Sequence, residues 1–335
     1  MVRRHKTRHD CSHALLALAR GAKAFVPTAH APPMPWKHWS SERIGFALAL
    51  LAAAGFSFKA IFVKLAYAVP QAQPVDSVTL LALRMLLALP AFVWVGWRSS
   101  QGLAPLTRRD WALLVALGLL GYYGASILDF MGLQYISASL ERLILFTYPT
   151  ITLLIGVLFM GKTASRREIG ALLLSYAGIG LAFTHDLQLA SDMGPVLLGG
   201  AFVLGSAVSY AFYQAGSEPV IRRLGAARFT ALAMLVSTVA TLAHFAATQP
   251  LQALVQPAAV YGHALGMALL STVLPVFMTS AAIRRIGAAP TVLIGTLGPM
   301  LTIVFSYWLL GEPLSLPQMA GAGLVLAGVL LVGRR

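Results

Sequence analysis

The chain has 335 residues, of which 58% are hydrophobic and only 11% are charged. Soluble globular proteins carry roughly 25% charged residues, so the main solvent of this surface is lipid rather than water. The formal net charge of +14 is typical of nucleic-acid-binding proteins, but its distribution along the chain has another explanation, and we predict no nucleic-acid partner. The single cysteine, Cys11, excludes an internal disulfide and a multi-cysteine metal site.

Residues 1–43 differ in composition from the rest of the chain. They are basic, contain several His and Pro residues, and have no long apolar run. Their ALLALA stretch is too short for the core of a signal peptide or for a membrane span. We predict a disordered cytoplasmic tail. The alternative is that translation starts at Met34 and that residues 1–33 are not made.

Ten apolar stretches follow, each bounded by charges or by Gly and Pro turns, and each about long enough to cross the hydrocarbon layer as a helix. In the predicted first repeat, residues 44–184, they are 45–67, 77–97, 111–131, 139–160 and 168–183. In the predicted second repeat, residues 185–335, they are 195–215, 229–248, 259–283, 289–310 and 317–333. The fold class is therefore an all-α integral membrane protein with ten transmembrane helices.

The basic residues support this count. Of the 25 Lys and Arg residues, 21 lie in the tail, at the C-terminal end and in alternate connections, and the other four lie inside predicted helices. The opposite connections carry acidic residues instead, namely Asp76, Asp186, Asp192 and Glu312. Because basic connections stay in the cytoplasm, both termini are predicted to be cytoplasmic, in a multi-pass protein of the cytoplasmic (inner) membrane.

An internal repeat is visible when the sequence is shifted by 150 residues. The segment beginning YISASLERLILFTYP aligns without a gap on the one beginning RIGAAPTVLIGTLGP, and Pro149 then meets Pro299. Each copy holds five helices, an odd number, so the two copies must be inverted in the membrane. Inverted repeats are typical of secondary transporters, which bind their substrate near the midplane between the repeats.

The ten-helix layout, the repeat and the ending GEPLSLPQMAGAGLVLAGVLL resemble the EamA-type family of the drug/metabolite transporter superfamily, over roughly residues 45–333. This resemblance implies a carrier of small organic metabolites, such as amino acids and related compounds, and often an exporter. The family has no universal binding motif, so the resemblance assigns no role to any residue. We predict no cofactor and no metal from the residues themselves. Some members of the superfamily form homodimers, which makes a homodimer one expectation for this chain.

Apart from Glu168, the first residue of the stretch 168–183, six charged residues lie inside the predicted helices: Lys59, Lys64, Arg84, Asp129, Glu141 and Arg142. Each costs about 2.5–3.5 kcal/mol at the bilayer centre, which makes it a functional candidate. All six belong to the first repeat. Their sum is +2, which suits an anionic or zwitterionic ligand.

Two roles are predicted for these charges. Lys59 and Arg84 are placed deepest, and we predict that they bind the substrate. Asp129 and Glu141 are the acids within the helices, and we predict that they couple transport to protons. The alternative is structural: Glu141 would pair with Arg84, Asp129 would pair with Lys59, and the remaining charges would extend to the membrane interface.

The prolines Pro149 and Pro299 are predicted to interrupt matching helices of the two repeats, because proline leaves a backbone carbonyl without its helical partner. Paired interruptions indicate the binding site of a transporter; the alternative is that these prolines are merely tolerated. Tyr148, Thr152 and Thr296 flank the interruptions and are predicted substrate contacts. The segment GYYGAS adds Tyr122, Tyr123 and Ser126, for which packing is the alternative.

The sequence thus predicts a secondary active transporter that moves a small polar organic metabolite, amino-acid-like or an organic anion, by alternating access, with export as the expected direction. Its expected partners are this substrate and membrane lipids. The alternative is an intramembrane enzyme that acts on a lipid-linked substrate. Such an enzyme needs a nucleophile with its base, or a metal site, inside the spans, and the sequence suggests neither.

Overall fold

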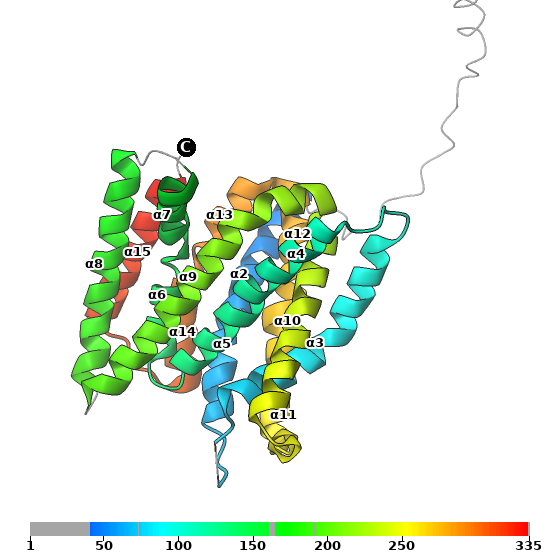
Figure 1. Cartoon of the computed structure of the whole chain (residues 1–335). Coiled ribbons are helices and arrows are strands. Elements are labelled where there is room, and N and C mark those ends of the chain that lie inside the picture. Colours follow the sequence, from blue (N-terminus) through cyan, green and yellow to red (C-terminus); the bar gives the residue numbers. More distant parts are fainter. Residues whose placement is uncertain (1–40, 73, 161–164, 190–191, 334–335) are drawn as a thin grey trace, which may run out of the picture. The chain divides into compact units, whose positions relative to one another are not determined.

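The computed structural model describes residues 41–72, 74–160, 165–189 and 192–333. Most of the predicted tail, residues 1–40, lies outside the described residues, as does the alternative start at Met34. Every regular element in the described ranges is a helix (Figure 1).

The helices form two consecutive sets, called here the first half and the second half. The first half contains α2 (Ser41–Tyr67), α3 (Ser77–Ser100), α4 (Arg108–Gly118), η1 (Leu119–Gly124), α5 (Ala125–Gly132), α6 (Ala138–Leu145), α7 (Tyr148–Met160) and α8 (Arg166–Leu189). The second half contains α9 (Met193–Leu224), α10 (Ala226–Thr248), η2 (Leu251–Leu254), α11 (Ala258–Ala268), η3 (Leu269–Val273), α12 (Leu274–Ile286), α13 (Ala288–Gly295), α14 (Gly298–Leu310) and α15 (Leu316–Gly333).

These elements account for the ten predicted spans. Within the described residues, seven helical stretches are long and apolar enough to cross a membrane, and three shorter apolar helices occupy 169–184, 298–310 and 316–328. The seven include α4–η1–α5, α6–α7 and α11–η3–α12 as single continuous stretches. The predicted fold class, ten transmembrane helices in two inverted five-helix repeats, is confirmed.

The observed helices extend beyond the predicted boundaries at several ends, such as that of α8 at Leu189, and most at the end of the sixth span. The span expected to end at residue 215 continues as α9 to Leu224, so that most of the expected connection 216–228 is helical. Glu218 and Arg222 lie one turn apart and pair at 3.6 Å, which adds modest support to an exposed helix. The helix ends at Gly225, whose φ of +81° favours glycine.

Short polar motifs begin several helices. Asp76 accepts hydrogen bonds from the backbone of Val78 and Thr79, at 2.9 and 3.0 Å, and so caps α3. Thr107 and Asp110 form a reciprocal capping box at the start of α4. Such caps satisfy backbone N–H groups that have no partner within the helix. The chain therefore specifies where these spans begin.

The two halves share their helix irregularities. The π-helical turns η1 and η3 begin at Leu119 and Leu269, and the interruptions between α6 and α7 and between α13 and α14 fall at 146–147 and 296–297. Both pairs are separated by 150 residues, the shift that aligns the repeats. Pro149 and Pro299 are each the second residue of the helix that follows the interruption. The positions of the helix irregularities therefore repeat between the halves, as the helices themselves do.

The halves pack into one another. Helix α2 of the first half packs against α12, α13 and α14, and α9 of the second half packs against α5, α6 and α7. The largest buried apolar cluster accordingly joins α2, α3 and α5 to α10 and α11. The first helix of each half therefore lies against the irregular spans of the other half.

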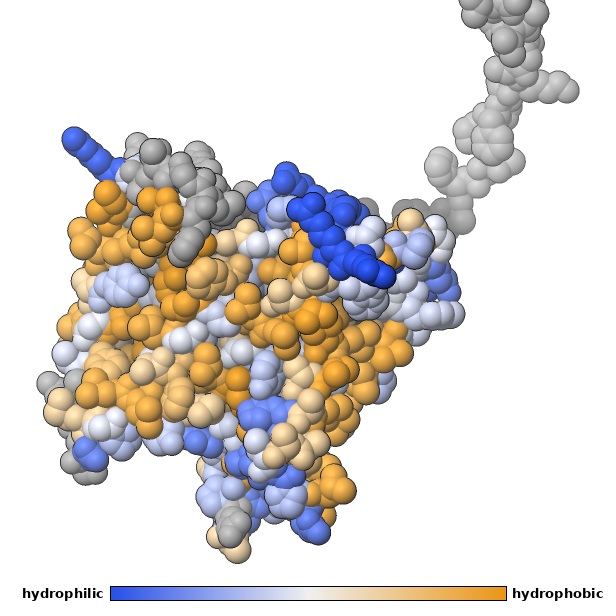
Figure 2. Space-filling model, viewed as in Figure 1, coloured by the Kyte–Doolittle hydropathy of each residue, from blue (hydrophilic) through white to orange (hydrophobic). Residues whose placement is uncertain are grey.

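The outer surface suits lipid. In the view of Figure 2 a broad hydrophobic band covers the middle of the face, and hydrophilic residues gather mainly at its upper and lower ends. Helices α8 and α15 pack along each other at one edge of Figure 1. A Cβ atom on Gly178 would lie 2.5 Å from the carbonyl oxygen of Gly321. Small residues here let the two helices approach closely, as expected in a membrane.

Candidate functional site

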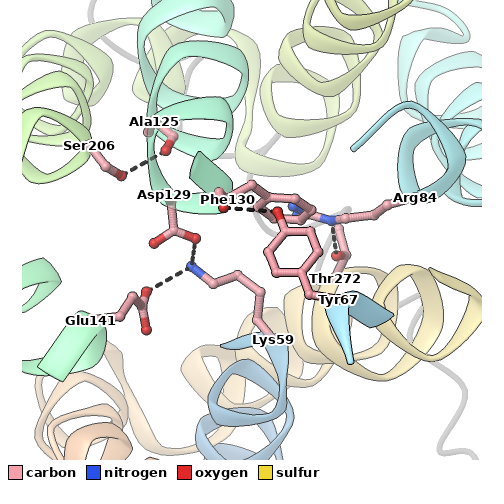
Figure 3. A network of polar contacts seen from close by, with 9 residues as sticks. All are labelled: Lys59, Tyr67, Arg84, Ala125, Asp129, Phe130, Glu141, Ser206 and Thr272. Carbon is pink, nitrogen blue, oxygen red and sulfur yellow. Dashed lines mark hydrogen bonds and ion pairs between the residues drawn. The ribbon is translucent and has the colours of Figure 1, made fainter. Parts of the chain in front are cut away.

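Three ionisable side chains of the first half meet in its interior. Lys59 of α2 places its Nζ 2.6 Å from Asp129 Oδ2 of α5 and 3.3 Å from Glu141 Oε1 of α6. Figure 3 shows both carboxylates turned toward the amine. Asp129 is 1% exposed and Glu141 is fully buried. One cation therefore serves two buried acids.

This arrangement realises part of the predicted structural alternative. The Asp129–Lys59 pair is present, but Glu141 contacts Lys59 instead of Arg84. A buried charge loses much of its hydration energy, and an oppositely charged partner offsets part of that loss, so a buried acid left without its cation is strongly unfavourable. Asp129 Oδ1 and Glu141 Oε2 have no hydrogen-bond partner among the described residues. Each acid of the cluster thus has an ion pair with Lys59, but one oxygen of each carboxylate has no hydrogen bond to a described residue.

Arg84 takes a partner from the other half. Its Nε donates to Thr272 Oγ1 at 3.2 Å, and its guanidinium carbon lies 5.6 Å from the centre of the Phe130 ring (Figure 3). Thr272 belongs to η3 and donates in turn to the carbonyl of Met267 at 2.9 Å. Arg84 is 7% exposed, and its Nη1 has no hydrogen-bond partner among the described residues. The π-helical turn of the second half thus holds an arginine of the first.

Arg142 is a further member of the site to which the sequence analysis gave no role. It follows Glu141 on α6, and successive side chains leave a helix about 100° apart, so the two point in different directions. Arg142 is 7% exposed, and its guanidinium carbon lies 5.2 Å from the centre of the Phe146 ring. Asp129 and Glu141 act on it electrostatically. The signal in the sequence was its position inside a predicted span.

Four tyrosines form a chain of ring contacts beside this cluster. Tyr148, which opens α7, packs edge-on against Tyr210 with ring centres 4.9 Å apart. Tyr210 lies 5.3 Å from Tyr213, and the hydroxyls of Tyr213 and Tyr122 are 2.9 Å apart. The sequence singled out Tyr122 and Tyr148. Tyr210 and Tyr213 of α9 were not among the candidates from the sequence, but they connect the two.

The remaining predicted contacts lie apart from one another. Tyr123 leaves η1 in another direction and pairs with His244 Nδ1 at 2.8 Å. Thr152 donates to the carbonyl of Tyr148 at 2.7 Å, within its own helix. Ser126 is half-buried in α5, and Thr296 is buried in the interruption between α13 and α14. Of this group, Thr296 lies at a helix interruption of the second half.

The serines of α9 satisfy carbonyl groups in and beside η1. Ser209 donates to Leu120 O at 2.8 Å, and Ser206 donates to Ala125 O at 2.7 Å (Figure 3). A π-helical turn leaves backbone groups without their regular partners and often occurs at functional sites. The second half thus supplies hydroxyl groups to an irregular turn of the first.

The halves are also tied together by Glu312, which follows α14. Its carboxylate accepts from the backbone N–H of Ala138 at 2.8 Å, from that of Ser139 at 3.3 Å, and from Ser139 Oγ at 2.9 Å. These N–H groups open α6, where a helix favours a negative charge. A residue of the second half therefore caps a helix of the first.

The charged groups do not line the apolar cleft between α6, α8 and α9. This cleft, of about 220 Å³, is bounded by Ile144, Thr147, Tyr176, Ile179, Phe183, Leu197, Gly200, Ala201 and Leu204. Within the described ranges no three His, Cys, Asp or Glu residues gather as metal ligands would. The chemistry of the site is therefore that of charge, aromatic rings and backbone carbonyls.

Together these features define a class: a multi-pass membrane protein made of two inverted repeats, with buried charges where the repeats meet. The sequence model of the EamA-like transporter family matches the chain twice, at residues 43–184 and 197–334. The chain belongs to this family.

Two relatives of this chain are named as uncharacterized transporters. The Bacillus subtilis (strain 168) protein named uncharacterized transporter YcbK is 30% identical over 288 residues, which cover 83% of this chain and 89% of the relative. Uncharacterized transporter YyaM of the same organism is 24% identical over 224 residues, or 67% of this chain and 73% of the relative. A protein of known crystal structure superposes with a TM-score of 0.59 at 16% identity, over 87% of this chain and 96% of its own.

Proposed function

We propose that this protein is a secondary active transporter that moves a small polar organic metabolite across the cytoplasmic membrane by alternating access. The observation that carries the proposal is a set of five charges inside the bundle that do not balance one another: Lys59, which is half-buried, and Arg84, Asp129, Glu141 and Arg142, which are buried. A purely structural network would be expected to neutralise itself, because an unbalanced buried charge is costly. A net positive cluster instead suits a ligand that brings negative charge.

The position of the cluster supports transport. Arg84 bonds to Thr272 in η3 at 3.2 Å, and Ser57 of α2 donates to the carbonyl of Gly298, the first residue of α14, at 3.0 Å. First-half groups therefore touch both irregular places of the second half. In transporters with inverted repeats, substrate sites lie where such broken helices meet. We place the substrate among Arg84, Tyr122, Tyr148 and Thr296, near Lys59.

Protons are the proposed driving ion. Asp129 and Glu141 compete for one amine, that of Lys59. A conformational change that moves α2 relative to α6 would leave one carboxylate without its cation, and that carboxylate would then take a proton. Proton binding is thereby linked to the rearrangement that exposes the substrate to the other side.

The orientation rests on the basic residues. Since 21 of the 25 Lys and Arg residues lie in the tail, at the C-terminal end and in alternate connections, we place these segments and both termini in the cytoplasm. The proposed repeats are residues 44–184 and 185–335, and the proposed direction is export, which follows from the family resemblance.

Transport by purified protein in liposomes tests the function. Candidate substrates come from metabolites that accumulate in the medium of an overexpressing strain. We expect uphill movement of such a metabolite when a pH gradient is imposed. Asp129→Asn or Glu141→Gln should keep exchange of substrate for substrate but lose uphill accumulation, since exchange needs no net proton movement.

Three results would contradict the proposal. Uphill transport that survives both substitutions would remove the proton role from these acids. Absence of exchange for every accumulated metabolite would argue against a carrier. Chemical conversion of a lipid-linked compound by the purified protein would support the alternative, an intramembrane enzyme.

A further inference from the structure

We propose that Arg142 and the first turn of α14 form the subsite for one carboxylate group of the substrate, which makes the substrate class a monocarboxylate. This inference rests on the proposed transport function and names the ligand chemistry of the same site. It differs from the sequence-based expectation, which gave the role of anion binding to Lys59 and Arg84.

The first observation is the state of Arg142. The side chain is 93% buried, since 7% of it is exposed, and its Nε has no hydrogen-bond partner among the described residues. The two nearby acids act on it electrostatically but pair with Lys59. A buried guanidinium normally has its fork of N–H donors occupied by a carboxylate or phosphate. Arg142 therefore has an unpartnered N–H donor at Nε in a position shielded from water.

The second observation is the direction in which Arg142 points. A Cβ atom built on Gly298 would lie 3.2 Å from Arg142 Nη2 and 3.2 Å from Phe146 Cζ. Gly298 is the first residue of α14, a helix of 13 residues. The absence of a side chain at Gly298 lets the guanidinium reach the beginning of that helix. Its carbonyl is fixed by Ser57 at 3.0 Å and by Thr302 at 3.1 Å.

These two groups carry the same sign of charge. The N-terminus of a helix bears a partial positive charge, and its first N–H groups lack helical partners. A guanidinium beside it is unfavourable unless an anion lies near both. Broken transmembrane helices in transporters direct such N-termini at anionic groups of the substrate. An anion between Arg142 and α14 would accept a hydrogen bond from the unpartnered Arg142 Nε and would lie at the positive end of the helix, where Pro299 itself has no N–H to donate.

While both acids are ionised, the charge balance of the cluster favours an anion with one negative charge. Lys59, Arg84 and Arg142 supply three positive charges, and Asp129 and Glu141 supply two negative ones. A single carboxylate neutralises the cluster, whereas a dicarboxylate or a phosphate dianion would leave it negative. Arg142 also acts on Tyr148 and Tyr210, whose rings offer a largely apolar wall for the rest of the molecule.

The test is ligand-dependent thermal stability of the purified full-length protein. Acetate, benzoate, succinate and inorganic phosphate are titrated at constant ionic strength, with chloride as the reference anion. We expect acetate and benzoate to raise the melting temperature of the wild type and the two dianions to do so less. Arg142→Gln should weaken the monocarboxylate effect by about tenfold or more, the value of a lost charge-assisted hydrogen bond.

Three variants keep the result interpretable. Arg98→Gln removes an exposed arginine that bonds to Gln101 and should bind like the wild type. Gly298→Ala should also weaken binding, because its Cβ takes the space next to Nη2. Arg142→Met fills the same volume without charge: if Arg142 is a ligand group, this variant melts no lower than the wild type in the absence of carboxylate. A large loss of stability in Arg142→Met would instead make Arg142 structural.

The outcomes separate this inference from the proposed function. No monocarboxylate effect in the wild type, an equal effect of dianions, or full binding by Arg142→Gln each overturns the subsite, even where transport is observed. Conversely, monocarboxylate binding that depends on Arg142 in a protein that transports nothing would support the subsite and overturn the transporter.

Discussion

The two halves of the molecule share their breaks but not their charges. The π-helical turns η1 and η3 and the interruptions at 146–147 and 296–297 recur at a spacing of 150 residues. At the same spacing, Asp129, Glu141 and Arg142 are replaced by Thr279, Thr291 and Val292. Backbone geometry is therefore duplicated, while these three charged residues occur in one copy only.

This difference indicates that the two halves contribute different features to the site. The first half contributes the charges, and the second half contributes the irregular backbone against which they lie. Arg84 bonds to Thr272 in η3, and Arg142 points at Gly298 beside an interruption. A charge in each half would place like groups close together across the pseudo-symmetric interface. Charges in one half alone avoid that repulsion and make the site asymmetric between the two halves.

The largest expected effect tests the inversion on which the comparison rests. The connection between α2 and α3, residues 68–76, is equivalent to Gly225 between α9 and α10. Inverted halves place these two points on opposite sides of the membrane. Reporter fusions truncated there should read external after residue 72 and cytoplasmic after Gly225, with no intermediate values.

The same signal from both fusions would mean that the halves are parallel, and the comparison would fail. Fusions in the connections after α3 and after α10 provide the control, since they should show the reverse pair of signals. Full-length protein must accumulate to similar levels in each strain.

The next largest effect concerns Lys59. Lys59→Met leaves Asp129 and Glu141 buried without their cation, and loss of one partner from a buried ion pair typically costs 3–5 kcal/mol. We expect a marked fall in the melting temperature of the purified protein, and partial recovery in the triple variant that adds Asp129→Asn and Glu141→Gln.

The second half supplies the matched control. Thr279, the equivalent of Asp129, is half-buried, and its side chain makes no polar contact with another described residue. Thr279→Val should therefore change the free energy of unfolding by less than about 0.5 kcal/mol. Equal effects of Lys59→Met and Thr279→Val would show that the charges of the first half contribute nothing to its stability.

Much of the fold could be predicted from the sequence because the bilayer imposes it. Span length, the distribution of basic residues and the 150-residue repeat each follow from one-dimensional patterns. The extension of α9 to Leu224 was missed because its last turns, with Glu218 and Arg222, are polar and outside the apolar run. Hydropathy identifies the part of a helix in lipid and not the part beyond it.

The site was predicted less completely, for a different reason. Lys59, Arg84, Asp129 and Glu141 were candidates from the sequence alone. The structure brings Lys59 into contact with both acids and buries Arg84 against η3. Their pairing could not be predicted, because it depends on how each helix is rotated about its axis. Arg142 and Gly298 are more than 150 residues apart, and neither the glycine nor the arginine has a local motif that indicates the other.

The smallest expected effect concerns Glu312, where the halves are joined at one end of the bundle. Its carboxylate holds the first two N–H groups of α6, and Ser139 Oγ also lies 2.8 Å from Ser306 Oγ. The residue at the equivalent position in the first half is Lys162, a donor that cannot cap a helix N-terminus. If the carrier opens alternately at its two ends, the end held by Glu312 has a contact that the repeat does not reproduce.

Glu312→Ala should therefore loosen one end without unfolding the protein. Loss of a helix N-cap costs about 1 kcal/mol, or roughly a fivefold change in an opening equilibrium. Hydrogen exchange measured by mass spectrometry should be faster by about this factor in peptides covering the start of α6, and unchanged in α10. Glu218→Ala, which removes an exposed acid paired with Arg222 at 3.6 Å, should leave both regions unchanged. Faster exchange throughout the chain would mean that Glu312 supports the whole fold, and no change at α6 would mean that the contact does not hold this end closed.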